Sequence, residues 1–194
     1  ITDVKSPGQL EKEIAQLRGP ARLSLSGHNE SDFQEADFIV LSPGVPLLPE
    51  LKRAASRGTP ILSEVELAYR FLRGRFIGIT GSNGKTTTTA LIGEILKAAK
   101  VDCAVAGNIG TPLISCAESP GGEETLRERT FVVELSSFQL ENIRDFKCWI
   151  ALLLNVTPDH LDRYPTLLDY ARAKERIFLN QTRQDYAVLN ADNS

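Results

Sequence analysis

The segment from Gly78 to Thr89, GITGSNGKTTTT, combines glycines, a lysine and threonines in an order that suits phosphate binding. It follows a run that predicts a strand and precedes a helical pattern, so backbone N–H groups and a helix N-terminus would face an anion. The usual phosphate-loop pattern has a glycine where this sequence has Ile79. A chance turn carrying a lysine is the alternative, but strand, glycines, lysine and helix come in the required order. We therefore predict phosphate binding by Gly81, Ser82, Asn83, Gly84, Lys85, Thr86 and Thr87.

Candidate metal ligands follow three predicted strands. The hydroxyl directly after the loop lysine, here that of Thr86, is where Mg²⁺ is usually held. Glu134 closes the apolar run TFVVE, and a carboxylate there is costly to bury unless it is paired or bound to a metal. His160 follows the run WIALLLN, between Asp159 and Asp162. Each residue alone would more often be an ordinary loop residue, but the carboxyl ends of parallel strands share one edge of a sheet. We therefore favour a common site.

Lys174 lies within the apolar stripe of a helix that is predicted to begin near Thr166, where Thr166 and Asp169 have the spacing of a capping box. The stripe consists of Leu167, Tyr170, Ala171, Ile177 and Phe178. A lysine on a buried face either extends its ammonium to the surface or has a lowered pKa and a neutral amine that is available for chemistry. The spacing alone leaves both interpretations open.

Short β-rich runs alternate with amphipathic stretches, which predicts an α/β fold with parallel strands. In the first part, the sequence predicts helices at 8–18, 47–57 and 63–72 and strands at 22–26, 37–42 and 60–62. After a hinge at 73–76, it predicts strands at 75–80, 101–106, 130–135 and 148–155, the last two inside the sheet. A helix from Gly84 to about Ala99 has an apolar face that is formed by Leu91, Ile92, Ile95, Leu96 and Ala99. Residues 118–129 are expected to form a surface loop.

The composition argues against several classes of function. The chain has 194 residues, a net charge of −3 and 42% hydrophobic residues, without the basic stripe of a nucleic-acid-binding protein. No apolar run reaches the roughly 20 residues of a membrane helix, and the N-terminus has no signal pattern, so we expect a cytoplasmic location. Cys103, Cys116 and Cys148 are odd in number and far apart, which indicates free thiols. We therefore expect no nucleic-acid or membrane partners. We also expect a monomer, although composition does not bear on the oligomeric state.

Four segments together resemble the Mur ligases: GITGSNGKTTT, AGNIGTP, VVELSSFQLE and LLNVTPDHLDRYPTLLDYARAKERIF. The match covers nearly the whole chain, and ELSSFQLE is typical of the members that add D-glutamate to UDP-N-acetylmuramoyl-L-alanine. The resemblance implies a three-domain cytoplasmic enzyme of peptidoglycan synthesis that uses ATP and Mg²⁺ to form an amide through an acyl phosphate. Residues 1–73 would be an incomplete, Rossmann-like N-terminal domain that binds the UDP part of the substrate. Residues 74–194 would be the central ATP-binding domain, a parallel sheet of the P-loop type.

The resemblance also implies roles for individual residues. Lys85 and the loop around it would hold the ATP phosphates, and Thr86 and Glu134 would bind Mg²⁺. His160 would bind a second Mg²⁺ together with Lys174, which the family carries as a carbamate. The residues expected to be catalytic are Lys85, Asn108, His160 and Lys174. The residues expected to contact the substrate are Asp3, Lys5, Ser42, Pro43, Gly44, Asn108, Ser136 and Gln139.

Relative to the family pattern, a first strand with a glycine-rich turn would precede Ile1 and a third domain would follow Ser194. We therefore expect the chain by itself not to be fully active. Three alternatives stay open: a folate-type or other Mur ligase with a different acceptor, a nucleotide-binding switch or motor ATPase, and a non-catalytic nucleotide-binding fragment. A switch or motor does not require His160 and Lys174, which disfavours that alternative.

Overall fold

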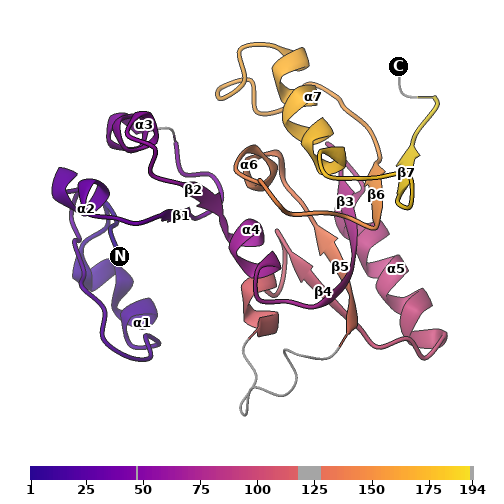
Figure 1. Cartoon of the computed structure of the whole chain (residues 1–194), viewed down its shortest axis with the longest axis horizontal. Coiled ribbons are helices and arrows are strands. Elements are labelled where there is room, and N and C mark those ends of the chain that lie inside the picture. The colour runs from indigo at the N-terminus through magenta and orange to yellow at the C-terminus, as the bar shows by residue number, and fades with distance from the viewer. Residues whose placement is uncertain (47, 118–127, 193–194) are drawn as a thin grey trace. The chain divides into compact units, whose positions relative to one another are not determined.

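The computed structural model describes residues 1–46, 48–117 and 128–192 (Figure 1). The chain divides into two compact units, Ile1–Ile39 with Pro46–Ile61 and Val40–Val45 with Leu62–Ser194. The helix α4 (Glu64–Tyr69) belongs to the second unit, although it precedes the sequence-based boundary after residue 73. The assignment of residues 1–73 to binding of the UDP part of the substrate and of residues 74–194 to binding of ATP stays a prediction.

The first unit contains short helices: η1 (Pro7–Leu10), α1 (Glu11–Ile14), α2 (Glu30–Gln34) and α3 (Pro49–Ser56). The helix predicted at 8–18 is shorter than expected and stops before the Gly19–Pro20 pair, where Gly19 has a φ of +94°. Residues 22–26 form no strand, which corrects the prediction, because Ser26 turns the backbone with a φ of +66° and only isolated bridges form. The helix α2, which the sequence did not predict, is anchored by the buried Phe33.

Two short strands, β1 (Ile39–Leu41) and β2 (Ile61–Ser63), pair with each other in a two-stranded sheet. Both lie where the sequence predicts strands, at 37–42 and 60–62. The predicted helices at 47–57 and 63–72 correspond to α3 and α4. The hydroxyl of Ser63 caps α4 by accepting a hydrogen bond from the N–H of Glu66, which explains why the strand changes to a helix at this residue.

The second unit is built on a parallel sheet of five strands in the order β4-β5-β3-β6-β7 (Figure 1). Their bounds are β3 (Gly74–Thr80), β4 (Cys103–Gly107), β5 (Arg129–Glu134), β6 (Ile150–Leu153) and β7 (Tyr186–Leu189). The strands predicted at 130–135 and 148–155 correspond to β5 and β6. Their predicted position inside the sheet is confirmed, since each has a strand on either side. In the register of β3, Ile79 lies opposite Glu134 and Thr80 lies opposite Leu153. The phosphate-loop candidate and the segments after β5 and β6 therefore leave the sheet at the same edge.

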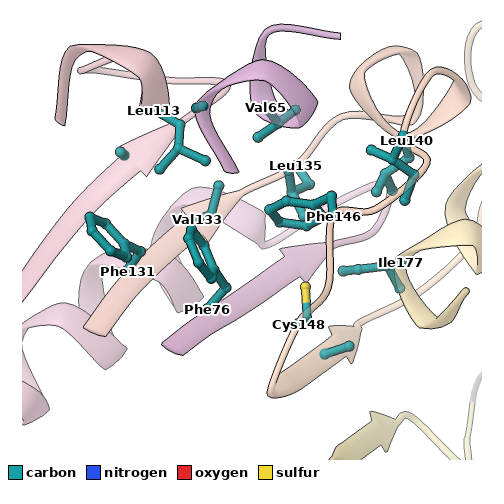
Figure 2. Packing of buried hydrophobic residues seen from close by; sticks show 14 of the residues in the cluster. Val65, Phe76, Leu113, Phe131, Val133, Leu135, Leu140, Phe146, Cys148 and Ile177 are labelled. Atoms are coloured by element: carbon teal, nitrogen blue, oxygen red, sulfur yellow. The ribbon is translucent and has the colours of Figure 1, made fainter. Parts of the chain in front are cut away.

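Side chains alternate between the two faces of this sheet, and each face has its own core. Phe76, Phe131 and Val133 point to the face that is covered by α4, α6 (Ser137–Glu141) and η2 (Leu113–Ala117) (Figure 2). The rings of Phe76 and Phe131 stack with their centroids 4.9 Å apart. Ile77, Ile79 and Val132 form the opposite core, against which Ile92 and Leu96 of α5 (Lys85–Ala98) pack.

The buried face of α5 differs in part from the predicted one. Ile92 and Leu96 pack on the sheet as expected, but Leu91 and Ile95 are 59% and 56% exposed. The helix instead turns Gly93 toward β4, where a Cβ on this glycine would lie 2.5 Å from a methyl group of Val105. Apolar spacing could not predict this rotation, because a glycine carries no hydrophobic signal.

The helix α7 (Leu167–Glu175) begins where the sequence predicts it. The hydroxyl of Thr166 accepts a hydrogen bond from the N–H of Asp169 over 3.1 Å, which confirms the predicted cap. Tyr170 is buried, whereas Leu167 is exposed, so the predicted stripe is shifted toward Ala173.

The surface loop predicted at 118–129 lies, apart from its last two residues, outside the described residues. Cys103, Cys116 and Cys148 are free thiols, as predicted. No described helix is long and apolar enough to span a membrane.

Glu66 of α4 is a fully buried carboxylate that holds the segment leading into β6. It accepts hydrogen bonds from the backbone N–H groups of Arg144, Asp145 and Phe146, at 2.8, 3.1 and 2.9 Å. Arg70 adds an ion pair at 3.4 Å from a partly exposed position. A buried charge is tolerated when several donors satisfy it, so Glu66 is an anchor between α4 and the sheet.

We predict that Glu66→Ala lowers the free energy of unfolding by about 3 kcal/mol, because it leaves buried N–H groups without an acceptor. Urea unfolding followed by circular dichroism measures the change. Arg70→Met, which removes only the ion pairs of this partly exposed arginine with Glu66 and Asp145, should cost about 1 kcal/mol or less. Equal losses in the two variants would mean that the ion pair, and not the backbone hydrogen bonds, carries the effect.

Candidate functional site

The loop after β3 is locked to the segment after β6 by hydrogen bonds. The N–H of Ser82 donates to the carbonyl of Asn155 over 3.0 Å, and the Asn155 side chain accepts from the N–H of Asn83 over 2.9 Å. The Ser82 hydroxyl donates to the carbonyl of Thr157 and accepts from its N–H, at 3.0 and 2.9 Å. Gly81, with a φ of +154°, lies so close that a Cβ would be 3.1 Å from Leu154. The loop is therefore held in one shape by its neighbour.

Two lysine side chains converge on a single carbonyl oxygen in this loop. The Nζ atoms of Lys85 and Lys174 both donate to the carbonyl of Gly81 over 2.9 Å, and Lys85 also donates to the carbonyl of Ser82 over 2.9 Å. Lys85 comes from the first turn of α5, whereas Lys174 comes from α7. Two positive charges that share one acceptor form a strongly electropositive point, to which an anion would be attracted.

Lys174 is only 1% exposed, so its ammonium does not extend to the surface. Its Nζ lies 4.4 Å from the centre of the Tyr170 ring. Burial, together with the nearby charge of Lys85, lowers the pKa of Lys174 to about 8. Of the two interpretations left open by the sequence, the structure contradicts the one in which Lys174 reaches the solvent and agrees with a perturbed, buried amine.

The threonines after Lys85 are accessible. Gly84, at the N-cap of α5, has a φ of +82°, and Thr86 and Thr87 are exposed in the first helical turn. A glycine suits this positive φ because it has no Cβ. The hydroxyl of Thr86 is therefore available for a ligand at the N-terminus of α5, where the helix dipole favours negative charge.

Glu134 and Asn108 are brought together at the ends of β5 and β4. Glu134 is 2% exposed, and its Oε1 accepts a hydrogen bond from Asn108 Nδ2 over 3.2 Å. The N–H of Asn108 also donates to the carbonyl of Glu134 over 2.9 Å. Gly107 permits this approach, because a Cβ there would collide with the backbone of Glu134. The sequence predicted roles for both residues but not that they bond to each other.

His160 lies among aromatic rings, one of which also contacts Lys174. Its ring is 4.9 Å from that of Phe138 and 6.0 Å from that of Tyr170, between centroids. Because the Tyr170 ring also faces Lys174, one aromatic side chain contacts both residues. The His160 side chain is 44% exposed, with Nε2 3.7 Å from Asp159. His160 therefore has an open side toward a ligand.

The predicted substrate residues after β5 have a structural role as well. Ser136 and Gln139 form a capping box at the start of α6, in which the Gln139 side chain accepts hydrogen bonds from the N–H and the hydroxyl of Ser136, each over 3.0 Å. A small pocket brings Gln139 next to the segment Ser42–Gly44, with Phe138 in the same wall. The structure thus places five of the predicted substrate residues near one another within the second unit.

Asp3 and Lys5 belong to the first unit. The Asp3 carboxylate accepts a hydrogen bond from the N–H of Lys5 over 2.8 Å, which shapes a tight turn. This turn lies beside the isolated bridges of Thr2 with Ser24 and of Asp3 with Gly27. Their role in contacting the substrate stays a prediction.

The residues predicted to bind metal provide suitable donor atoms. Within the described residues, no group of three His, Cys, Asp or Glu side chains lies close enough to hold a metal by itself. Mg²⁺ prefers oxygen ligands and is usually bound by one or two protein groups together with waters and substrate phosphates. A threonine hydroxyl and a buried carboxylate at the same sheet edge fit that mode of binding.

Sequence reasoning missed residues that shape the site without having a motif of their own. The Asn155 side chain holds the loop after β3 in place. In the sequence, only its position directly after an apolar strand could have indicated this role. Glu64 accepts a hydrogen bond from the N–H of Ile114 over 2.6 Å, and burial raises its pKa although Gln139 also bonds to it. Nothing in the sequence around Glu64 indicated these contacts, because its partners are distant along the chain.

An apolar cleft of about 640 Å³ adjoins the loop. It lies at the carboxyl ends of β6 and β7 beside α7, and its lining includes Leu154, Leu168 and Leu189. Asn155, which holds the phosphate loop, lines it as well. Because its walls are mainly apolar, the cleft suits an apolar group rather than a phosphate.

Comparison with known proteins agrees with this arrangement. The sequence profile of the Mur ligase middle domain matches residues 79–194. A UDP-N-acetylmuramoylalanine--D-glutamate ligase of Koribacter versatilis is 50% identical over the whole chain. The chain spans 42% of the length of that relative.

Two solved structures share the fold. The UDP-N-acetylmuramate:L-alanyl-gamma-D-glutamyl-meso-diaminopimelate ligase from Neisseria meningitides is 19% identical, with a TM-score of 0.58 over all of this chain and 63% of its own. The MurF ligase from Thermotoga maritima, solved in complex with ADP, is 21% identical, with a TM-score of 0.51 over 82% of this chain and 44% of its own. Together with the profile match over more than half of the residues, the glycine-lysine loop at the sheet edge shows that this chain belongs to the Mur ligase family.

Proposed function

We propose that this chain is part of an ATP-dependent ligase that joins D-glutamate to UDP-N-acetylmuramoyl-L-alanine in peptidoglycan synthesis. The observation that carries the proposal is the convergence of Lys85 and Lys174 on the carbonyl of Gly81, at the sheet edge where Glu134 also lies. His160 contacts the Tyr170 ring that Lys174 also faces. A phosphate and a carboxylate must be brought together for such a reaction, and both are anions. The name of the 50% identical relative supports the choice of substrates.

The chemistry proposed for each residue is consistent with its position. Lys85 and the N–H groups of residues 81–87 hold the ATP phosphates, so that positive charge and fixed dipoles face the γ-phosphate as the substrate carboxylate attacks it. Asn108, bonded to Glu134, orients the reacting carboxylate. This attack releases ADP and gives an acyl phosphate. The neutral amine of D-glutamate then attacks the acyl carbon, and the amide forms as inorganic phosphate leaves and the nitrogen loses a proton. Ser136, Gln139 and Ser42–Gly44 contact the sugar and uridine parts, and Asp3 and Lys5 contact the uracil.

Thr86 and Glu134 are the residues that would hold Mg²⁺ at the phosphates, and His160 with a carbamate on Lys174 would hold a second Mg²⁺. Bound Mg²⁺ supplies neutralisation of the phosphate charge. A buried lysine with a lowered pKa is suited to carbamate formation, since only the neutral amine reacts with CO₂. We expect the protein to act as a monomer in the cytoplasm.

The alternatives differ in what they require of the site. A nucleotide-binding switch or motor needs the phosphate loop but not the buried Lys174 and the His160 that share the Tyr170 ring. A non-catalytic fragment is consistent with the chain's span of 42% of the relative's length, and residues 1–194 alone are not expected to complete the reaction.

The proposal is tested by phosphate release from a protein of the relatives' length that contains this chain. Release should require ATP, Mg²⁺, UDP-N-acetylmuramoyl-L-alanine and D-glutamate together, and omission of each one in turn should abolish it. Hydrolysis that proceeds without the two other substrates would contradict the ligase and favour a switch or motor. Turnover with another amino acid in place of D-glutamate would indicate a sister ligase.

Lys85→Met should weaken binding of ATP by at least about tenfold, or about 1.4 kcal/mol, because it removes a charge that faces the phosphates. Isothermal titration calorimetry with this chain and a non-hydrolysable ATP analogue measures the effect. Lys97→Met is the matched control, since Lys97 lies on the same helix α5 but pairs with Glu94 on the exposed surface. Similar affinities of the two variants would show that Lys85 does not contact the phosphates.

Lys174→Met should change how the stability depends on pH. The pKa of Lys174 is lowered from 10.5 to about 8, so between these values the unfolded chain binds more protons than the folded chain. Wild-type stability should therefore gain a contribution as pH rises from about 8 to about 10, and the variant should lack it. Urea unfolding in buffer free of CO₂ measures both proteins, with the exposed Lys52→Met as control. Parallel pH profiles of Lys174→Met and wild type would contradict the lowered pKa.

A further inference from the structure

Arg163, which lies three residues after His160, binds two other segments of the second unit. Its Nη2 and Nε atoms donate to the two carboxylate oxygens of Glu141, at 2.6 and 3.3 Å. Its Nη1 atom donates to the carbonyl of Val45 over 3.0 Å. The guanidinium also lies 5.0 Å from the centre of the Phe138 ring. One side chain therefore holds α6 and the end of the segment 42–45 at the same time.

Tyr164 strengthens the same connection. Its hydroxyl donates a short hydrogen bond of 2.5 Å to Glu141, and its ring stacks on Phe138 with an angle of 8° between the planes. The backbone N–H groups of Arg163 and Tyr164 both donate to the carbonyl of His160 over 3.0 Å. His160 has a φ of +53°, which an ordinary side chain adopts only when its surroundings hold it there.

The geometry points to Arg163 as a positioning residue that, through Glu141 and Tyr164, fixes the segment Ser42–Val45 relative to His160. This inference rests on the proposed function, in which the segment 42–44 lies beside the uridine and His160 binds a metal near the reacting carboxylate. The substrate would then be held at two places whose separation is set by one arginine. Arg163 need not touch the substrate to act in this way.

An arginine suits this role better than a lysine. Its planar guanidinium donates in several fixed directions, so it can bind a carboxylate with two atoms and a carbonyl with a third. The side chains of Arg163 and Glu141 are 21% and 24% exposed, so the pair is shielded in part from water. The hydrogen bond that Arg163 donates to the Glu141 carboxylate raises the pKa of Arg163 further, which keeps the guanidinium charged.

The contacts of Arg163 involve the segment that is proposed to bind the UDP substrate and not the loop that is proposed to bind ATP. Asn155 and Thr157 hold the loop after β3. Arg163, in contrast, binds Glu141 and Val45. Loss of the arginine fork should therefore displace the segment 42–45 and His160 while the ATP loop keeps its shape. A displacement of about 1 Å at a substrate-positioning group can lower the rate by roughly two orders of magnitude.

We predict that Arg163→Lys raises the KM for UDP-N-acetylmuramoyl-L-alanine and lowers kcat, each by at least about fivefold, while the KM for ATP stays within about twofold of wild type. Steady-state kinetics in a protein of the relatives' length that contains this chain provide the measurement. Glu141→Gln, which keeps the shape but removes the charge, should show the same split to a smaller degree. In the double variant, Glu141→Gln should then change KM and kcat by a smaller factor than it does in the wild-type background, because the two residues act as one unit.

Arg176→Lys is the matched control. Arg176 donates to the carbonyls of Leu140 and Ile143 at the end of α6, over 2.8 Å each, so its loss disturbs the same helix without breaking the contact with Val45. It should lower the melting temperature and leave both KM values near wild type. If Arg163→Lys matched this control, or if the KM for ATP rose together with that for the UDP substrate, the positioning role would be refuted.

Amide hydrogen exchange on residues 1–194 provides a readout that does not depend on turnover. In Arg163→Lys the amides of Ser42, Gly44 and Val45 and of the His160 turn should exchange faster than in wild type and in Arg176→Lys. If wild type shows no ligase turnover but the exchange differs in this way, the proposed function fails and the contact role of Arg163 stands. If wild type is active and the exchange at these amides does not change, the inference fails and the proposed function stands.

Discussion

The hydrogen bonds between the loop 81–83 and residues 155–157 are the constraint on which the rest of the site depends. They join the segments that leave two neighbouring strands, β3 and β6, at the carboxyl edge of the sheet. Because Ser82, Asn83, Asn155 and Thr157 satisfy one another, the phosphate loop has its shape before any ligand arrives. Preorganisation of this kind lowers the entropy that binding must overcome.

The electrostatics of the site follow from this locked loop. Its carbonyl at Gly81 is the common acceptor of Lys85 and Lys174, which approach from helices on different parts of the chain. An anion placed there would relieve the repulsion between the two ammonium groups, and that agrees with membership of a family of ATP-dependent ligases. The same repulsion, added to burial, accounts for the lowered pKa of Lys174. Binding of an anion at this point and the charge of Lys174 would thus be physically linked.

Three glutamates of the second unit position other segments around the loop by accepting hydrogen bonds from them. Glu66 holds the backbone before β6, Glu134 holds Asn108, and Glu141 holds Arg163 and Tyr164. In each case a carboxylate from one element accepts hydrogen bonds from another, which replaces the water that it loses. These three carboxylates connect α4, β5 and α6 to the segments that carry the predicted functional residues.

The sequence by itself determined the parallel α/β arrangement, the glycine-lysine loop between β3 and α5 and the place of Lys174 among the apolar residues of α7, because strand and helix periodicity, glycine spacing and capping are local properties. Whether the Lys174 ammonium reaches the solvent was decided by the tertiary structure, which buries it. Because parallel strands end together, the sequence also predicted that the segments carrying Glu134 and His160 leave the sheet at one edge, as the register of β3 with β5 and β6 shows. Tertiary structure alone decided the short first helix, the absent strand at 22–26, the rotation of α5 onto Gly93 and the contacts of Asn155, Glu64 and Arg163. Those features depend on partners far apart in the chain, and a hydrogen bond between distant residues leaves no periodic signal in either of them.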